Sequence, residues 1–350
     1  MKFVITVIVA ILIQFSYSGC ATSNGSTFSN GKRADAPLIV KSRIPLLPAV
    51  RGISFDFDFT ENQRLWNTVD WGQKDPQFFS FSDDLGKSWR AVEVPESFGT
   101  RSTIKFISQE NGWAVSSMNI VRTTDGGKSW RKIPLPKDSE INEIKGITFN
   151  DVEQGFLAGS TSLRERGSGE ETPGMEILCT NDGGENWSVC FKTNEYDLIQ
   201  KIISTESVVI GLLWETGILR SNDGGHIWER KNLDFKIRDV AINSDGRIWS
   251  LGDDSLLRYS NDLGDSWQTA PIVNISQKIR WNSLVFNNNG VGIVVSDQGK
   301  IGLTTDNGYT WNIHSDIIFS ESLWTVRAQG SYIAILGERN LYILELNTKK

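Results

Sequence analysis

The chain has 350 residues, of which 39% are hydrophobic, so it is long enough to bury a large core. Its 42 acidic residues outnumber its 36 lysines and arginines and give a formal net charge of -6. A protein that follows nucleic-acid phosphates carries the opposite balance, because it must neutralise backbone charge, so the composition argues against a nucleic-acid partner.

The N-terminus has the pattern of an export signal. An uncharged stretch, residues 3–15, follows Lys2 and is too short to cross a bilayer as a permanent helix. The tripeptide Ser-Gly-Cys that ends at Cys20 resembles the lipobox of bacterial lipoproteins, although Tyr17 stands where an aliphatic residue is usual.

This resemblance implies that residues 1–19 are a cleaved signal peptide and that Cys20 is lipidated. Ala21 follows the cysteine, and by resemblance to enterobacterial sorting this favours the outer membrane, with the protein facing the periplasm or the cell surface. Residues 20–36 are then the lipidated cysteine and a flexible tether rich in Ser, Thr, Asn and Gly, and residues 37–350 form one folded domain. The alternative is a secreted protein without an anchor.

One octet occurs six times, with the form Ser/Thr-x-Asp-x-Gly-x-(Ser/Thr/Asn/Ile)-Trp. Its Asp, Gly and Trp are present in every copy, and successive copies start 41, 57, 41, 39 and 44 residues apart. A repeat of this length is typical of propellers and other repeat folds. The copies are Ser82–Trp89, Thr123–Trp130, Thr180–Trp187, Ser221–Trp228, Ser260–Trp267 and Thr304–Trp311.

The octet has the chemistry of a tight turn. Its carboxylate can accept hydrogen bonds from nearby backbone N–H groups, its glycine can adopt a positive φ, and its tryptophan can cover the hairpin. It resembles the Asp box, or bacterial neuraminidase repeat, of sialidases, sortilin and the photosystem II assembly-factor propellers. The resemblance implies a structural role for the aspartates, against catalysis or calcium binding as alternatives: Asp84, Asp125, Asp182, Asp223, Asp262 and Asp306.

Strand-like runs of β-branched and aromatic residues surround each octet, with the octet between the third and the fourth run. Four such runs separated by turn residues make one propeller blade. The predicted blades are residues 50–95, 104–136, 144–193, 199–235, 237–273 and 278–315.

Residues 322–346 contain three further strand-like runs without an octet. The segment Leu38–Ile44 precedes the first blade and supplies the missing fourth strand, which closes the ring and removes an open sheet edge. The sequence therefore predicts an all-β fold, a seven-bladed propeller of four-stranded antiparallel blades. The alternative is a six-bladed ring with the C-terminal strands as an appendage.

Two cysteines besides Cys20 flank the third octet. Ten residues separate Cys179 from Cys190, and this even number can place them directly opposite each other on antiparallel strands. A structural disulfide and two free thiols both remain open. The two histidines, His226 and His314, belong to no Cys/His cluster, so we predict no metal site and no cofactor.

Strand direction alternates within a blade, so the octets and the turns between first and second strands lie on one face, called here the clasp face. We expect binding on the opposite face, where the insertion at residues 160–176 also lies. This insertion accounts for the interval of 57 residues, and its alternative interpretation is a mobile surface excursion. The candidate contact residues are Trp71, Arg164, Arg166, Tyr196 and Trp214.

Three tryptophans, Trp66, Trp113 and Trp249, recur on predicted second strands, with Phe156 in the matching place. This recurrence indicates a core between the blades rather than a ligand surface.

The first functional hypothesis is a non-catalytic binding or assembly protein. The octets, the second strands that begin Gly-Trp or Gly-Phe, and the lipoprotein-like signal are similar to the photosystem II assembly-factor propellers and their relatives in non-photosynthetic bacteria. The resemblance covers residues 38–346, but it does not name a partner, and the acidic charge argues against a photosystem. We expect an envelope protein or a glycan.

The second hypothesis is a sialidase-like glycoside hydrolase. Residues 42–45 resemble the Phe/Tyr-Arg-Ile-Pro motif of sialidases, whose arginine would be Arg43. That mechanism also needs two more arginines, a tyrosine nucleophile with a glutamate partner and an aspartic acid. The sequence does not single out such a set, and Arg43 lies in the strand needed for ring closure. We therefore assign no catalytic residue.

Overall fold

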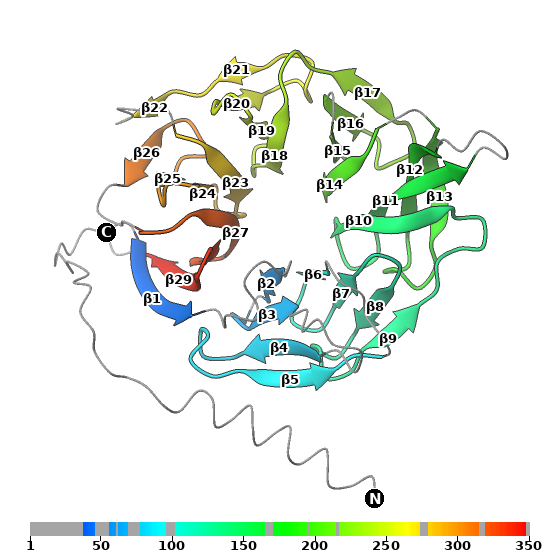
Figure 1. The fold of residues 1–350 in the computed structure, drawn as a ribbon, viewed down its shortest axis with the longest axis horizontal. Coiled ribbons are helices and arrows are strands. Elements are labelled where there is room, and N and C mark those ends of the chain that lie inside the picture. The colour runs from blue at the N-terminus through cyan, green and yellow to red at the C-terminus, as the bar shows by residue number, and fades with distance from the viewer. Residues whose placement is uncertain are drawn as a thin grey trace, which may run out of the picture.

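The computed structural model describes residues 38–45, 56–60, 62–68, 78–95, 102–164, 171–194, 197–214, 217–273, 279–314 and 319–347. Within these ranges all the regular secondary-structure elements are β-strands. They form seven sheets arranged around a ring (Figure 1). This confirms the predicted seven-bladed propeller and excludes six blades. No helix long and apolar enough to cross a membrane occurs in the same ranges.

Each of the first six blades uses four consecutive strands, the first of which lies nearest the axis (Figure 1). Blade one contains β2 (Phe57–Phe59), β3 (Leu65–Thr68), β4 (Phe78–Ser82) and β5 (Arg90–Glu93), and blade two β6 (Thr103–Phe106), β7 (Gly112–Val115), β8 (Ile120–Thr123) and β9 (Arg131–Ile133). Blade three contains β10 (Ile141–Phe149), β11 (Gly155–Arg164), β12 (Glu171–Thr180) and β13 (Ser188–Thr193), and blade four β14 (Ile199–Ser204), β15 (Val209–Leu213), β16 (Gly217–Ser221) and β17 (Glu229–Asn232). Blade five contains β18 (Ile237–Ile242), β19 (Ile248–Gly252), β20 (Leu257–Ser260) and β21 (Gln268–Thr269), and blade six β23 (Trp281–Phe286), β24 (Gly292–Ser296), β25 (Ile301–Thr304) and β26 (Trp311–His314).

Blade seven closes the ring. It contains β27 (Leu323–Gln329), β28 (Tyr332–Gly337), β29 (Asn340–Leu346) and the N-terminal β1 (Leu38–Pro45). β1 and β29 are antiparallel, and their register runs from Leu38 opposite Leu346 to Pro45 opposite Asn340. The predicted closure by an N-terminal strand is therefore confirmed.

The boundary between blades five and six differs from the prediction. Ile272 and Val273 form a short strand, β22 (Ile272–Val273), which pairs in parallel with β26 of blade six and gives that blade a fifth strand. Pro271 explains the change of sheet, because it has no N–H to continue the ladder of blade five.

The second-strand aromatics fill the core between the blades, as the sequence predicts. Trp66, Trp113, Phe156 and Trp249 are fully buried. The box glycine of the following blade packs against each ring, and a Cβ added to Gly127 would lie only 2.2 Å from the Trp66 ring. Glycine is therefore required both for its positive φ and for this close approach.

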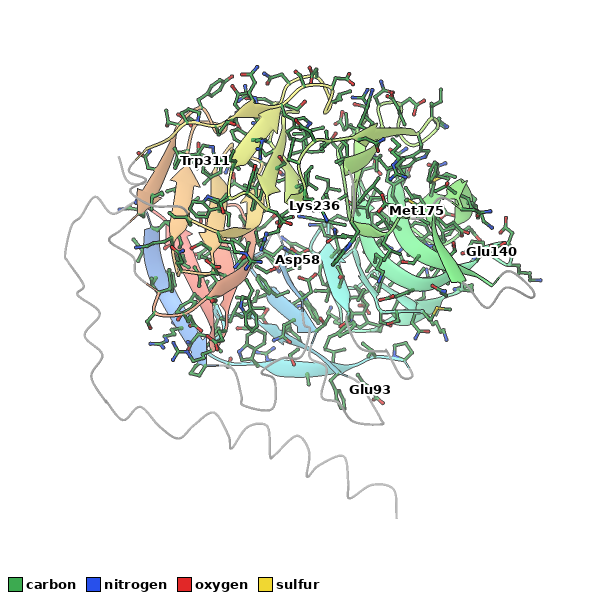
Figure 2. The ribbon with its side chains drawn as sticks, turned by 45° about the horizontal axis from the view of Figure 1, so that its top comes forward. Asp58, Glu93, Glu140, Met175, Lys236 and Trp311 are labelled. Atoms are coloured by element: carbon green, nitrogen blue, oxygen red, sulfur yellow. A yellow bond between two sulfur atoms is a disulfide. The ribbon has the colours of Figure 1, made fainter. Side chains whose placement is uncertain are left out.

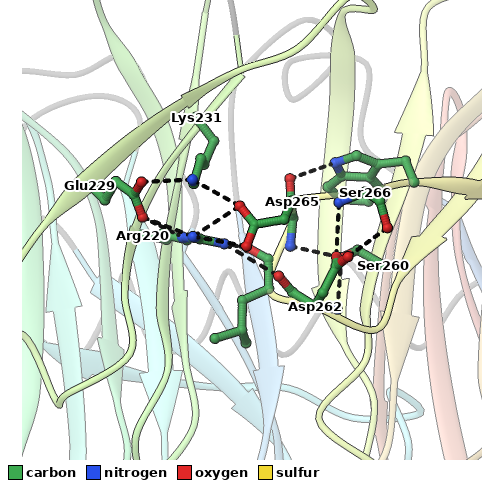
Figure 3. Close-up of polar contacts among 10 residues, drawn as sticks. Arg220, Glu229, Lys231, Ser260, Asp262, Asp265 and Ser266 are labelled. Carbon is green, nitrogen blue, oxygen red and sulfur yellow. Dashed lines mark hydrogen bonds and ion pairs between the residues drawn. The ribbon is translucent and has the colours of Figure 1, made fainter.

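A second kind of contact between neighbouring blades is not apparent from the sequence. In five boxes a backbone carbonyl accepts a hydrogen bond from a side chain of the preceding blade. Figure 3 shows the most extensive case, in which Arg220 contacts the blade-five box and shares Glu229 and Asp265 with Lys231. The five pairs are Arg64 with Gly126 (3.1 Å), Trp113 with Gly183 (3.0 Å), Gln154 with Gly224 (3.5 Å), Arg220 with Leu263 (2.7 Å) and Asn243 with Asn307 (2.8 Å).

Candidate functional site

The Asp-box carboxylates hold their own turns. In blade five, Oδ1 of Asp262 accepts hydrogen bonds from the Ser260 hydroxyl (2.7 Å) and the Ser266 N–H (2.9 Å). Oδ2 of Asp262 accepts from the Ser266 hydroxyl. The hydrogen bonds from Ser266 and then Ser260 lower the pKa of Asp262 to about 2. The same pattern holds Asp84, Asp125, Asp182 and Asp306, so these carboxylates have little capacity left for a ligand.

Cys179 and Cys190 are joined by a disulfide, with their Cα atoms 5.8 Å apart. The direct cross-strand pairing expected from the even spacing is wrong, because Cys179 lies opposite Ser188. A β-bulge in β13 leaves Cys190 without a partner in the ladder, and this extra residue lets its side chain reach Cys179.

The candidate contact residues are only partly placed. Trp71, Arg166 and Tyr196 lie outside the described residues. Arg164 ends β11 opposite Glu171, and Trp214 follows β15 with 57% of its surface exposed. Trp214 therefore has the exposure that a contact residue needs.

The insertion of blade three continues the sheet. β11 and β12 are ten residues each and pair without interruption to Arg164 opposite Glu171, at the right of Figure 1. β-Hairpin pairing thus extends into the residues that we expected to form a loop. Whether the insertion is a binding element or a mobile surface excursion stays a prediction.

Ion pairs between neighbouring blades surround the axis of the ring. Arg327 Nη2 lies 2.9 Å from Asp56 Oδ1, Lys105 Nζ 3.5 Å from Asp58 Oδ2, and Lys201 Nζ 2.5 Å from Asp239 Oδ1. The three carboxylates are buried, whereas the three cations remain partly exposed. In these three pairs the cation is therefore the more accessible partner.

Burial and charge act in opposite directions on one of these pairs. Burial raises the pKa of Asp56, although Arg327 opposes the shift. Burial would lower the pKa of Arg327, but the attraction of Asp56 and the neighbouring carboxylates outweighs it, and the net shift is upward. Figure 2 shows Asp58 and the exposed Lys236 near the same axis.

A tyrosine, a glutamate and an arginine meet in blade seven, a set that we did not recognise in the sequence. The Tyr342 hydroxyl donates to Glu321, and Arg43 Nε donates to Asn340 (3.1 Å), whose amide also bonds Glu321 (2.6 Å). Tyr342 is 2% exposed, and the pKa of its hydroxyl is raised by burial and by the bond to Glu321. A buried tyrosine that ionises less readily is a poor nucleophile, so this set does not support sialidase chemistry.

No group of three or more His, Cys, Asp or Glu suited to a metal ion occurs in the part of the chain that the structure describes.

The chain matches a family model described as "Photosynthesis system II assembly factor YCF48" over residues 81–194 and 192–347. It is similar to "Photosystem II assembly lipoprotein Ycf48" of Prochlorococcus marinus (strain MIT 9312), with 22% identity over 74% of this chain and 89% of that protein. The protein of the same name from Synechococcus sp. (strain CC9902) is 26% identical over 47% of this chain, and the alignment spans 46% of that relative's length.

A solved structure, "YCF48 bound to D1 peptide", superposes with a TM-score of 0.66. It is 17% identical, and the match covers 89% of this chain and 97% of that chain. At this identity the likeness shows the fold alone.

Proposed function

Because this chain belongs to the YCF48 family of photosystem II assembly factors, we propose that it is a non-catalytic lipoprotein that serves as a binding or assembly scaffold in the cell envelope. Its homologues are named assembly factors, and one solved relative is bound to a D1 peptide. For this chain we propose a protein partner, bound on the face opposite the clasps through a segment of its chain.

The observation that carries this proposal is the set of partly exposed cations around the axis. Lys105, Lys201 and Arg327 cover buried carboxylates, so an approaching segment meets positive groups first. Trp214 (57% exposed) and Trp324 (40% exposed) lie at opposite-face strand ends. Tryptophan and arginine carry a disproportionate share of interface energy, and these residues favour an acidic, partly apolar segment.

The position of β1 supports an orientation relative to a membrane. Leu38 starts β1 beside Leu346, whose N–H donates to Ser331 in the β27–β28 turn (2.8 Å) on the clasp face. If Cys20 carries the lipid, the segment after it joins the domain on this face. The tether then leaves the opposite face uncovered, and we propose the outer membrane as the anchoring membrane.

Site-specific photo-crosslinking tests the proposal. A photoreactive amino acid replaces Trp214 on the opposite face or, as the matched control, the exposed Lys128 of a clasp. We expect one envelope protein to be crosslinked at position 214 and not at position 128. Equal crosslinking from both positions, or none from position 214, would contradict a partner surface opposite the clasps.

A further inference from the structure

The Asp box of blade four departs from the other five at its seventh position. The others place Ser88, Ser129, Asn186, Ser266 or Thr310 there, and each side chain donates to Oδ2 of its box aspartate. Blade four has Ile227, which cannot donate and is 71% exposed. The blade-four box therefore lacks the side-chain hydrogen bond to Oδ2 and carries an exposed apolar side chain at that position.

The aspartate of this box retains a free carboxylate oxygen. Oδ1 of Asp223 accepts from the Ser221 hydroxyl (2.7 Å) and the Ile227 N–H (2.9 Å), so the turn is still held. None of the described residues donates a hydrogen bond to Oδ2. This oxygen is available to a donor from another molecule.

A pocket adjoins the same box, between blades three and four. Its volume is about 150 Å³, the space of about five water molecules. Phe156 and the disulfide of Cys179 form its apolar wall, and Gln154 and His226 add polar groups. The pocket is large enough for the end of one long side chain.

The charge around the pocket is negative. Asp151 and Glu153 lie in the β10–β11 turn of blade three next to Gln154, and Glu206 precedes Ser207, whose carbonyl accepts from Gly224 of the box (3.0 Å). All three acids are exposed, and none forms an ion pair within the described ranges. Val152 is also exposed, so apolar and acidic groups alternate here.

We propose that Gln154, Asp223, His226 and Ile227, the Ile227 patch, form a second docking site. Its occupant is a protein segment in which an arginine or lysine lies beside an aliphatic residue. The cation binds Oδ2 of Asp223 and is attracted by the surrounding acids, and the aliphatic side chain packs on Ile227. The site lies on the clasp face and is independent of the surface proposed above.

The test uses the full chain and fluorescent octapeptides in an anisotropy titration. The probe alternates leucine with arginine, and the matched peptides alternate leucine with glutamate or glycine with arginine. Ile227→Ser restores the polar residue of the other boxes, so it supplies a donor for Asp223 Oδ2 and removes the apolar contact without threatening the fold. Ser88→Ile is the control for the surroundings of the box: it places the same isoleucine beside Asp84 and removes the donor to Asp84 Oδ2, but the neighbouring acid Asp83 is already paired with Arg64 (2.6 Å).

We expect the leucine-arginine peptide to bind the native chain more tightly than either matched peptide, and more weakly as salt is added. Ile227→Ser should weaken this binding by about tenfold or more, and Ser88→Ile should not change it. Equal binding by the native chain and Ile227→Ser, or no preference for the leucine-arginine peptide, would overturn the proposal. Dimerisation of the native chain that Ile227→Ser abolishes, seen by sedimentation, would assign the patch to a second copy instead. Crosslinking at position 214 tests the surface opposite the clasps, so its outcome does not depend on the peptide titrations, which test the Ile227 patch.

Discussion

The contact between a box glycine and the preceding blade can be measured with a matched pair of alanine substitutions. Gly127 and Gly246 have nearly the same φ, +80° and +79°. A Cβ at Gly127 would lie 2.2 Å from the Trp66 ring, whereas a Cβ at Gly246 would meet no atom within 4 Å. Both substitutions force alanine into the left-handed region, which costs about 1–2 kcal/mol. Only Gly127→Ala also overpacks a buried ring.

Trp66 has no room to move away, because its ring stacks on Phe106 at 5.2 Å and meets Trp130 edge-on at 5.9 Å. Overpacking costs about 1–3 kcal/mol more, so the free energy of unfolding should fall by about 2–5 kcal/mol for Gly127→Ala and by about 1–2 kcal/mol for Gly246→Ala. Urea unfolding followed by tryptophan fluorescence measures both. In a Trp66→Leu background, which is itself destabilised, Gly127→Ala should cost only the about 1–2 kcal/mol of the left-handed backbone. Equal losses for the two alanine variants, within about 0.5 kcal/mol, would refute the packing argument.

Four further outcomes are expected. Thiol labelling of denatured, unreduced protein should detect neither Cys179 nor Cys190, and two reactive thiols there would disprove the bond. Stability should fall as the pH is lowered from about 4 to 2. The clasp aspartates have a lower pKa folded than unfolded (Asp182 and Asp262 about 2, against 3.8), so the unfolded chain binds more protons in that window. A urea midpoint that stays unchanged down to about pH 2.5 would contradict this. A fluorogenic sialoside should not be hydrolysed, and hydrolysis that Arg43→Ala abolishes would restore the catalytic hypothesis. Replacing residues 163–172 by Asn-Gly should preserve the melting temperature, since the buried Met175 and Glu176 remain in place. The same variant should recover less of the partner protein from envelope extract. Unchanged recovery would show that the projecting hairpin makes no contact with the partner.

The features predicted correctly from the sequence depend on local chemistry. The partners of Asp262 are two and four residues away, so the octet alone encodes its turn. Ring closure followed from a count of strands, because three C-terminal runs and one N-terminal run complete a blade in only one way. These inferences needed no knowledge of how distant segments pack.

The features that the sequence did not predict depend on distant contacts or on single irregular residues. Arg220 reaches Leu263, and Arg43 meets Asn340 near Tyr342, with no pattern in the intervening sequence. The bulge at Cys190 shifts a register that spacing alone predicts to be regular. Three of the candidate contact residues, Trp71, Arg166 and Tyr196, lie outside the described residues, so their role stays a prediction.

A repeated fold supplies its own control for such irregular residues, because six boxes perform the same structural task. Two boxes place a large hydrophobic side chain on the surface, Ile227 in blade four and Tyr309 in blade six. Tyr309 has a structural explanation, since the guanidinium of Arg247 lies 4.7 Å from its ring centroid and also covers Tyr259. Its box also keeps the bond from Thr310 to Asp306. Ile227 has neither the ring contact of Tyr309 nor the side-chain hydrogen bond of the other boxes, and this combination with its 71% exposure is the basis for proposing the Ile227 patch.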